Sequence, residues 1–196
     1  MFIIINNYMP QFIKDFIRAY RHRKILRTIK VPKNGVILDL SCSDGSFLGR
    51  LHTVAPNLDL FGIDISSEDI QKAKTNFPGI SFKTGSVDKL DFESNSFDTI
   101  FSTMSLHHYE KPNEFFTEAN RILKLGGILY LTDLIPKYEW TQRIHNWKGC
   151  PEPYHFERFY SIKDLEKILN PLGFHIIKHT RVTLVPRIRL LTIQKS

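Results

Sequence analysis

The chain has 196 residues, a formal net charge of +7, 42% hydrophobic residues and 12% aromatic residues, which is the size and composition of one globular domain with a substantial core. Its two cysteines, Cys42 and Cys150, exclude a disulfide framework and lack metal-ligand spacing, and no apolar run reaches the length of a signal-peptide core or a membrane span. We therefore expect a single cytoplasmic domain over residues 1–196, with no transmembrane segment and no metal site.

Positive charge is concentrated at the two ends of the chain. Residues 1–35 contain eight Lys or Arg against one acid, Asp15, and residues 171–196 contain five and no acid, so the segment between them is net acidic. Apolar residues repeat at helical spacing from Pro10 to Ile29, and residues 1–34 are expected to form an amphipathic basic helix. We favour a solvated polar face for its charges, and contact with nucleic acid or an acidic membrane surface is the alternative.

Strands and helices alternate along the rest of the chain. In chain order, the pattern predicts a strand from residue 36, a helix over 46–55, a strand ending at Asp64, a helix from Ser66 to Pro78, strands over 80–83 and 97–101, a helix over 112–124 ended by Gly126-Gly127, a strand over 128–132, a helix from Ser161 to Asn170, and strands near 174–180 and 188–194. This alternation predicts an α/β fold with a single doubly wound, mostly parallel sheet and helices on both faces. The last strand is expected to be antiparallel.

Residues 134–160 interrupt the alternation. They are rich in aromatic residues, among them Tyr138, Trp140, Trp147 and Tyr154, without a continuous period. Because the segment follows the strand at 128–132, it begins at the sheet edge where ligands bind in such folds. We interpret it as a cover over the substrate.

A polar turn and an acid are spaced as in a nucleotide site. The first strand and its turn, VILDLSCSDG, end at Gly45, and Asp64 follows 19 residues later at the end of the second strand. This is close to the roughly 20-residue interval at which such an acid meets a ribose held over the turn. The spacing therefore predicts an adenosine-containing ligand.

Three stretches occur in a characteristic order: VILDLSCSDG, FGIDIS and SFDTIFSTMSLHHYEKPNEFFTEANRILKLGGILYLTD. Together they resemble the class I S-adenosylmethionine-dependent methyltransferases of the small-molecule type, which include the quinone-biosynthesis C-methyltransferases. The resemblance covers about residues 35–135 and implies the Rossmann-like methyltransferase fold, with S-adenosyl-L-methionine as cofactor and S-adenosyl-L-homocysteine as product. Ser41 and Ser43 depart from the family pattern, because they replace glycines that are usual in this turn.

The resemblance also implies which residues contact the cofactor. Asp39, Ser41 and Gly45 are expected around the methionine end, Asp64 on both ribose hydroxyls, and Ile65 on the adenine. The remaining expected contacts are Ser86, Val87, Asp88, Ser102 and His107. A solvated turn acid is an equal alternative for Asp88, which lies two positions after the residue that usually approaches the adenine amino group.

Three residues are candidates for proton transfer during catalysis. His108 follows the fourth strand, Asp133 ends the fifth strand at the same edge, and His155 lies in the aromatic segment. A histidine can take the proton of a hydroxyl or an acidic carbon, whereas an amine or thiolate acceptor needs no base. The alternatives are one packed and one solvated histidine for the pair at 107 and 108, and a surface loop histidine at 155.

The predicted function is transfer of a methyl group from S-adenosylmethionine to a small-molecule acceptor, mainly by positioning and desolvation of the reactants. An RNA methyltransferase and a noncatalytic methyltransferase-like binding protein are the alternatives, and the sequence leaves the oligomeric state open. Residues 102–105 read STMS, without the Asn/Asp-Pro-Pro-Tyr/Phe motif common in nucleic-acid enzymes, so nucleic acid is not the expected acceptor. A nicotinamide-dependent oxidoreductase is disfavoured because the turn has no GxGxxG.

Overall fold

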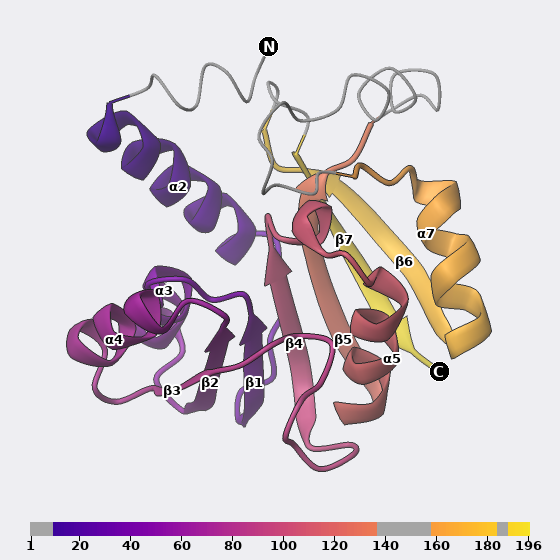
Figure 1. Cartoon of the computed structure of the whole chain (residues 1–196), viewed down its shortest axis with the longest axis horizontal. Helices are drawn as coiled ribbons and strands as arrows, with labels where there is room; N and C mark the ends of the chain where they lie inside the picture. The colour runs from indigo at the N-terminus through magenta and orange to yellow at the C-terminus, as the bar shows by residue number, and fades with distance from the viewer. Residues whose placement is uncertain (1–9, 137–157, 184–187) are drawn as a thin grey trace.

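The computed structural model describes residues 10–136, 158–183 and 188–196. Within them, seven strands form one sheet in the order β3-β2-β1-β4-β5-β7-β6 (Figure 1). The strands are β1 Gly35–Leu40, β2 Leu58–Asp64, β3 Ser81–Thr84, β4 Phe97–Thr103, β5 Leu123–Leu134, β6 Phe174–Arg181 and β7 Ile188–Lys195. The pairs from β3 to β5 are parallel, and β7 is antiparallel to both β5 and β6. The expected mostly parallel sheet with an antiparallel last strand is confirmed.

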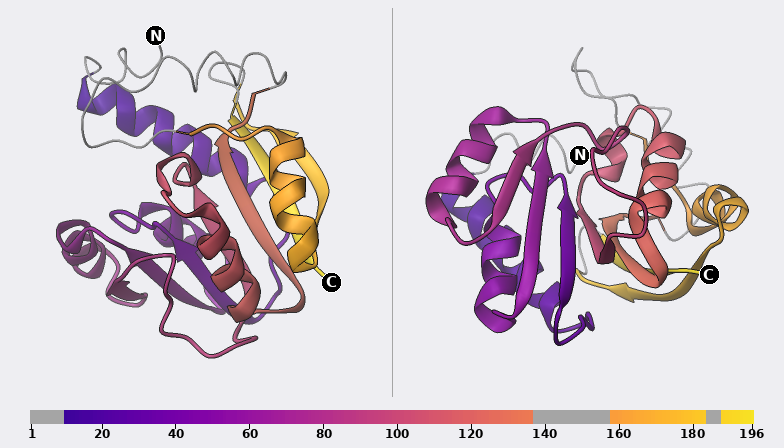
Figure 2. Two further views of the ribbon diagram at one scale, coloured as in Figure 1. Left: turned by 45° about the vertical axis from the view of Figure 1, so that its right-hand side comes forward. Right: turned by 90° about the horizontal axis from the view of Figure 1, so that it is seen from below.

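Helices pack on both faces of this sheet (Figure 2). They are α2 Gln11–Leu26, α3 Ser46–Val54, α4 Ser67–Asn76, α5 Pro112–Ile122 and α7 Ile162–Leu169, with 3-10 turns η1 Leu106–His108 and η2 Asn170–Leu172. One buried cluster joins α3, α4 and the end of α2 to the sheet through Ile25, Phe47 and Ile70. A second cluster joins α5 and α7 to the opposite face through Phe115 and Leu165. No helix in these ranges is long and apolar enough to cross a membrane.

Local capping explains where two of the helices begin. The Ser66 hydroxyl accepts a hydrogen bond from the Asp69 backbone N–H, 3.2 Å away, at the start of α4. Ser161 and Asp164 form a reciprocal capping box at the start of α7. Both starts agree with the prediction, because an N-cap hydroxyl satisfies a backbone donor that has no partner within the helix.

Two predicted boundaries are wrong. The helix starting at Pro112 ends at Ile122, and Gly126-Gly127 lies inside β5 instead of ending the helix. Gly126 has φ +74°, and the pairing of β4 with β5 changes register here, which makes the glycine pair an irregularity of the strand. The basic N-terminal helix, expected over 1–34, also ends earlier than expected, because α2 spans Gln11–Leu26 and residues 29–34 are not helical; residues 1–9 lie outside the described part of the chain.

The topology brings distant residues to one edge of the sheet. β1 and β4 lie side by side in the middle of the sheet. From β1 the chain continues outward to β2 and β3 on one side, and from β4 it continues to β5 on the other, so the direction of strand addition reverses between β1 and β4. In open α/β sheets, ligands bind outside the carboxyl ends of the strands at such a reversal. Asp39, Asp64 and Asp133 are at or next to the carboxyl ends of β1, β2 and β5, so the predicted acids lie at this edge.

Candidate functional site

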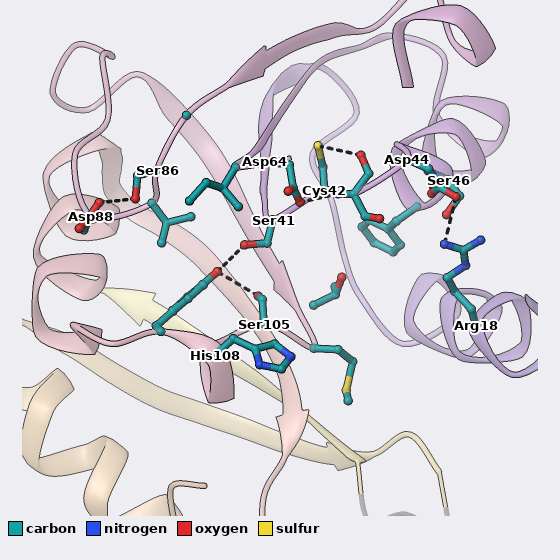
Figure 3. Close-up of a pocket in the computed structure, with 18 of the residues that line it drawn as sticks. Arg18, Ser41, Cys42, Asp44, Ser46, Asp64, Ser86, Asp88, Ser105 and His108 are labelled. Atoms are coloured by element: carbon teal, nitrogen blue, oxygen red, sulfur yellow. Dashed lines mark hydrogen bonds and ion pairs between the residues drawn. The ribbon is translucent and has the colours of Figure 1, made fainter. Parts of the chain in front are cut away.

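A cavity of about 680 Å³ lies at this edge (Figure 3). Its walls come from α2, the turn between β1 and α3, the end of β2, the loop after β3 and the segment after β4. The predicted site residues that line it are Ser41, Asp64, Ile65, Ser86, Val87, Asp88 and His108. Residues separated by nearly seventy positions in the chain are thus brought to one cavity.

The turn after β1 keeps a glycine-like backbone although two of its residues are serines. Ser41 has φ 66°, Ser43 has φ 49° and Gly45 has φ 73°, all in the left-handed region. Such a conformation costs a residue with a side chain about 1–2 kcal/mol, so the surroundings must hold it in place. At Gly45 a Cβ atom would lie 2.7 Å from the Phe82 ring, which leaves room for glycine only.

Asp64 holds this turn from the neighbouring strand. One carboxylate oxygen accepts a hydrogen bond from the Ser43 backbone N–H (2.8 Å), and the other accepts one from the Ser66 backbone N–H (2.9 Å). Each carboxylate oxygen has two acceptor positions, so one on each remains for a ligand. The carboxylate thus supports the start of α4 and also lines the cavity, so one side chain can serve both the fold and a ligand.

The wall beyond Asp64 combines an apolar and a polar surface. The Ile65 side chain is 79% exposed on the cavity wall. Ser86 donates a hydrogen bond to Asp88, and the two residues line the same cavity with Val87. An exposed aliphatic side chain can pack against the face of a flat ring, and a nearby carboxylate can accept a hydrogen bond from an amino group on that ring.

Asp39 is a buried carboxylate with no compensating partner in the described residues. Its side chain is 1% exposed, and neither oxygen has a hydrogen-bond partner there. Burial, together with the charge of Asp64, raises the pKa of Asp39 well above its usual value. Asp39 does not line the cavity and lies on β1 just before Ser41. A cation held at the turn would stabilise the ionised form of Asp39 and offset the cost of its burial, so these acceptor oxygens fit a positively charged ligand group.

Tyr109 links the turn to the segment after β4, and the sequence pattern did not single it out. Its hydroxyl lies 2.9 Å from the Ser41 hydroxyl, 2.9 Å from the Ser105 hydroxyl and 3.3 Å from the Ser102 hydroxyl. Burial raises the pKa of Tyr109, which therefore stays neutral. Ser102, a predicted cofactor contact, is fully buried within this network and does not line the cavity.

The two adjacent histidines take different positions. His107 is buried, and its Nδ1 lies 2.8 Å from an Asp133 carboxylate oxygen. The backbone N–H of His107 donates to the other oxygen of Asp133, 3.2 Å away. His108 is exposed and lines the cavity, with its ring centre 3.9 Å from that of His107. Of the candidate catalytic residues, His108 reaches the cavity, Asp133 lies behind it, and His155 is outside the described residues, as is most of the predicted cover over 134–160.

Helix α2 contributes a basic wall that the sequence analysis did not assign to the site. Arg18, Arg21 and His22 line the cavity. Arg18 forms an ion pair with Asp44 in the turn, with an N–O distance of 3.0 Å. Figure 3 shows the Arg18 side chain pointing toward this turn. Burial and the neighbouring arginines lower the pKa of His22 to about 3, so this histidine is neutral at physiological pH. The spacing of three between the arginines places them on one helix face, but only the packing of α2 shows what that face meets.

A family model described as a methyltransferase domain matches residues 32–174. A curated relative, the phthiotriol/phenolphthiotriol dimycocerosates methyltransferase 1 of Mycobacterium ulcerans, is 30% identical over 117 residues, which are 59% of this chain and 43% of the relative. The demethylmenaquinone methyltransferase of Chlorobaculum tepidum is 24% identical over 142 residues, covering 72% of this chain and 58% of the relative. The chain thus spans about half the length of these two curated relatives.

Solved structures show the same fold. A structure described as a SAM-dependent methyltransferase from Methanosarcina mazei superposes with a TM-score of 0.70 at 22% identity, covering 84% of this chain and 94% of that one. At this identity the likeness shows the fold alone.

Proposed function

The chain belongs to the methyltransferase-domain family, with the sheet of the class I S-adenosylmethionine-dependent enzymes, and from this premise we propose that it transfers a methyl group from S-adenosylmethionine to a small-molecule acceptor. The observation that carries the proposal is the arrangement of Asp64 opposite the left-handed turn. The carboxylate has one acceptor position left on each oxygen, and the turn beside it keeps the backbone shape that glycines would allow.

We assign the cofactor to the cavity in one orientation. The ribose hydroxyls donate to Asp64, the adenine lies against Ile65 near Ser86, Val87 and Asp88, and the methionine end lies at the turn formed by Ser41 to Gly45. Asp39 supports this orientation, because its buried side chain has no hydrogen-bond partner in the described residues. In this orientation the cationic end of the ligand approaches the Asp39 carboxyl group. Ser102 and His107, both buried behind the cavity wall, act in this assignment by supporting Tyr109 and His108.

When bound, the cofactor supplies an activated methyl group on its sulfonium, so the protein mainly has to position the acceptor and exclude water. His108 is the exposed imidazole on the cavity wall and is our candidate to take a proton from a hydroxyl or acidic carbon. Asp133 acts through His107: its carboxylate accepts from the ring and from the backbone of that residue, and this orients the ring against which His108 packs. His155 remains a predicted participant.

Two observations support a small acceptor. The curated relatives described above are named for lipid and quinone compounds, which are small molecules. The segment between the basic chain ends is net acidic, and although α2 adds Arg18 and Arg21 to the cavity wall, the wall also carries Asp44, Asp64, Asp88 and Glu110. The cavity therefore has no excess of positive charge that would attract a phosphate-rich polymer. We retain residues 134–160 as the proposed cover of this acceptor, and residues 1–196 as one proposed domain.

The test is to compare ligand classes and then to look for turnover. Calorimetric titration with S-adenosylhomocysteine and, separately, with NAD distinguishes a methyltransferase from an oxidoreductase. Methyl-labelled cofactor incubated with small-molecule extracts and with transfer RNA then reports the acceptor class. Binding of NAD without S-adenosylhomocysteine would contradict the proposal, and label found only in RNA would replace the small-molecule acceptor.

A further inference from the structure

Arg21 is a cation on the cavity wall that has no counter-ion in the described part of the chain. Its side chain lines the cavity, and its buried Nε has no hydrogen-bond partner there. Burial, followed by the charge of Arg18, lowers the pKa of Arg21 to about 10, so the guanidinium is still charged at neutral pH. A buried charge without a partner is costly unless a ligand supplies the opposite charge.

Its neighbours on α2 are compensated differently. Arg18, one helical turn earlier, is 2.9 Å from Asp15 and 3.0 Å from Asp44. His22 is neutral. The charge of Asp133 acts favourably on Arg21, but the carboxylate of Asp133 already accepts hydrogen bonds from His107 and from the Leu134 backbone N–H. His22 Nδ1 also has no hydrogen-bond partner there, but it carries no charge. Arg21 is therefore the one charged group among these three cavity-lining residues of α2 that has no bound partner in the described part of the chain.

The position of Arg21 indicates which part of a ligand it meets. Arg18 is the arginine that contacts the turn after β1, where the methionine end of the cofactor is assigned. Ile25, one helical turn after Arg21, packs in the buried cluster that contains Phe101 of β4 and Tyr130 of β5. The charge of Asp133 at the end of β5 also acts on Arg21, and β5 is separated from β1 by β4. The guanidinium is thus placed toward the part of the site formed by β4 and β5, where His108 also lines the wall.

We propose that Arg21 is a specificity residue that binds an anionic group, a carboxylate or phosphate, carried by the methyl acceptor. The inference rests on the proposed methyl transfer and adds the chemical class of the substrate. A planar guanidinium binds such groups through two parallel hydrogen bonds, which fixes their orientation as well as their charge. The carboxylate of the cofactor itself has the same chemistry, so the experiment must distinguish these two sources.

The experiment uses the full chain and the variants Arg21→Met, Arg21→Lys and Arg23→Met. Arg23 is the matched control, because it is an exposed arginine of the same helix that does not line the cavity. The protein is first titrated with S-adenosylhomocysteine and with methylthioadenosine, which lacks the amino-acid end. The complex with S-adenosylhomocysteine is then titrated with benzoate, decanoate and phenyl phosphate, each beside its uncharged methyl ester or parent alcohol.

We expect wild type and Arg23→Met to bind at least one acid more tightly than its uncharged counterpart, and Arg21→Met to lose about ten-fold or more of that acid affinity. Arg21→Lys should retain part of it, since it keeps the charge without the planar pair of donors. The ratio of affinities for S-adenosylhomocysteine and methylthioadenosine should be the same in all variants. Melting temperatures check folding, and Arg21→Met should not fall below wild type because it removes an uncompensated charge.

Two results would overturn the inference. If Arg21→Met erases the preference for S-adenosylhomocysteine over methylthioadenosine, the arginine holds the cofactor carboxylate. If wild type prefers none of the acids, the cavity has no acceptor anion site. Failure of wild type to bind S-adenosylhomocysteine at all would instead contradict the proposed function, so the two failures are distinguishable.

Discussion

Replacing Asp64 with alanine is expected to weaken the binding of S-adenosylhomocysteine about ten- to a hundred-fold. An ionised carboxylate offers about four acceptor positions, and the backbone N–H groups of Ser43 and Ser66 occupy one on each oxygen. One position on each oxygen remains, which matches the two hydroxyls of a ribose. Losing two charge-assisted hydrogen bonds costs on the order of 1.5 to 3 kcal/mol, which corresponds to the stated range of affinity.

The same substitution also affects the turn, so the assay must separate two effects. Without the carboxylate, the Ser43 backbone N–H loses its acceptor, and we expect a loss of about 1–3 kcal/mol in the free energy of unfolding. Titrations with adenosine and with 2′,3′-dideoxyadenosine resolve the ambiguity. A distorted turn weakens both ligands equally, whereas loss of the ribose contact weakens adenosine alone.

Asp59→Ala is the matched control, because Asp59 is an exposed acid on the same strand and does not line the cavity. It should leave both affinities unchanged. If Asp64→Ala still prefers adenosine over the dideoxy compound by the wild-type factor, Asp64 does not bind the ribose, and the assignment of the cofactor orientation is refuted.

Three further predictions concern other parts of the site. Because burial and the charge of Asp64 raise the pKa of Asp39 above its usual value of 3.8, the folded state binds more protons than the unfolded state between the two values, and stability should fall as pH rises through that window. Asp39→Asn should flatten this slope in ligand-free thermal melts between pH 4 and 8 and raise the melting temperature at pH 7; identical slopes would contradict the burial of an uncompensated carboxylate. Asp133→Ala leaves the ring and backbone donors of His107 without their acceptor. Denaturant titrations should therefore show a free energy of unfolding lower by about 2–4 kcal/mol. An unchanged value would mean that the His107–Asp133 pair is solvated. The affinity for nucleic acid should be weak and should fall steeply when salt is raised from 50 to 200 mM, while the rate of methyl transfer changes little. Sequence-selective RNA binding that resists salt would favour the RNA methyltransferase instead.

Much of the fold could be predicted because its signals are local. The alternation of strand and helix periods, from which a mostly parallel sheet follows, and the caps at Ser66 and Ser161 depend on residues close together in the sequence. The order of the strands across the sheet depends on pairing between distant segments. The error at Gly126-Gly127 shows the limit of such signals. A glycine pair is compatible with a helix end and with an irregular strand, and the pairing of β4 with β5, which the sequence pattern does not specify, decided between them.

The sequence by itself determined the sheet edge and its acids, since strand ends and the interval from Gly45 to Asp64 depend only on chain length and periodicity. Tertiary structure alone decided which polar groups lack partners and which face the cavity. His107 and His108 are adjacent, yet one is buried against Asp133 and the other lines the wall. Arg21 became a site residue only when α2 packed beside the turn after β1. Burial and pairing arise from contacts between segments far apart in the chain, and those contacts set the charge balance on which binding depends.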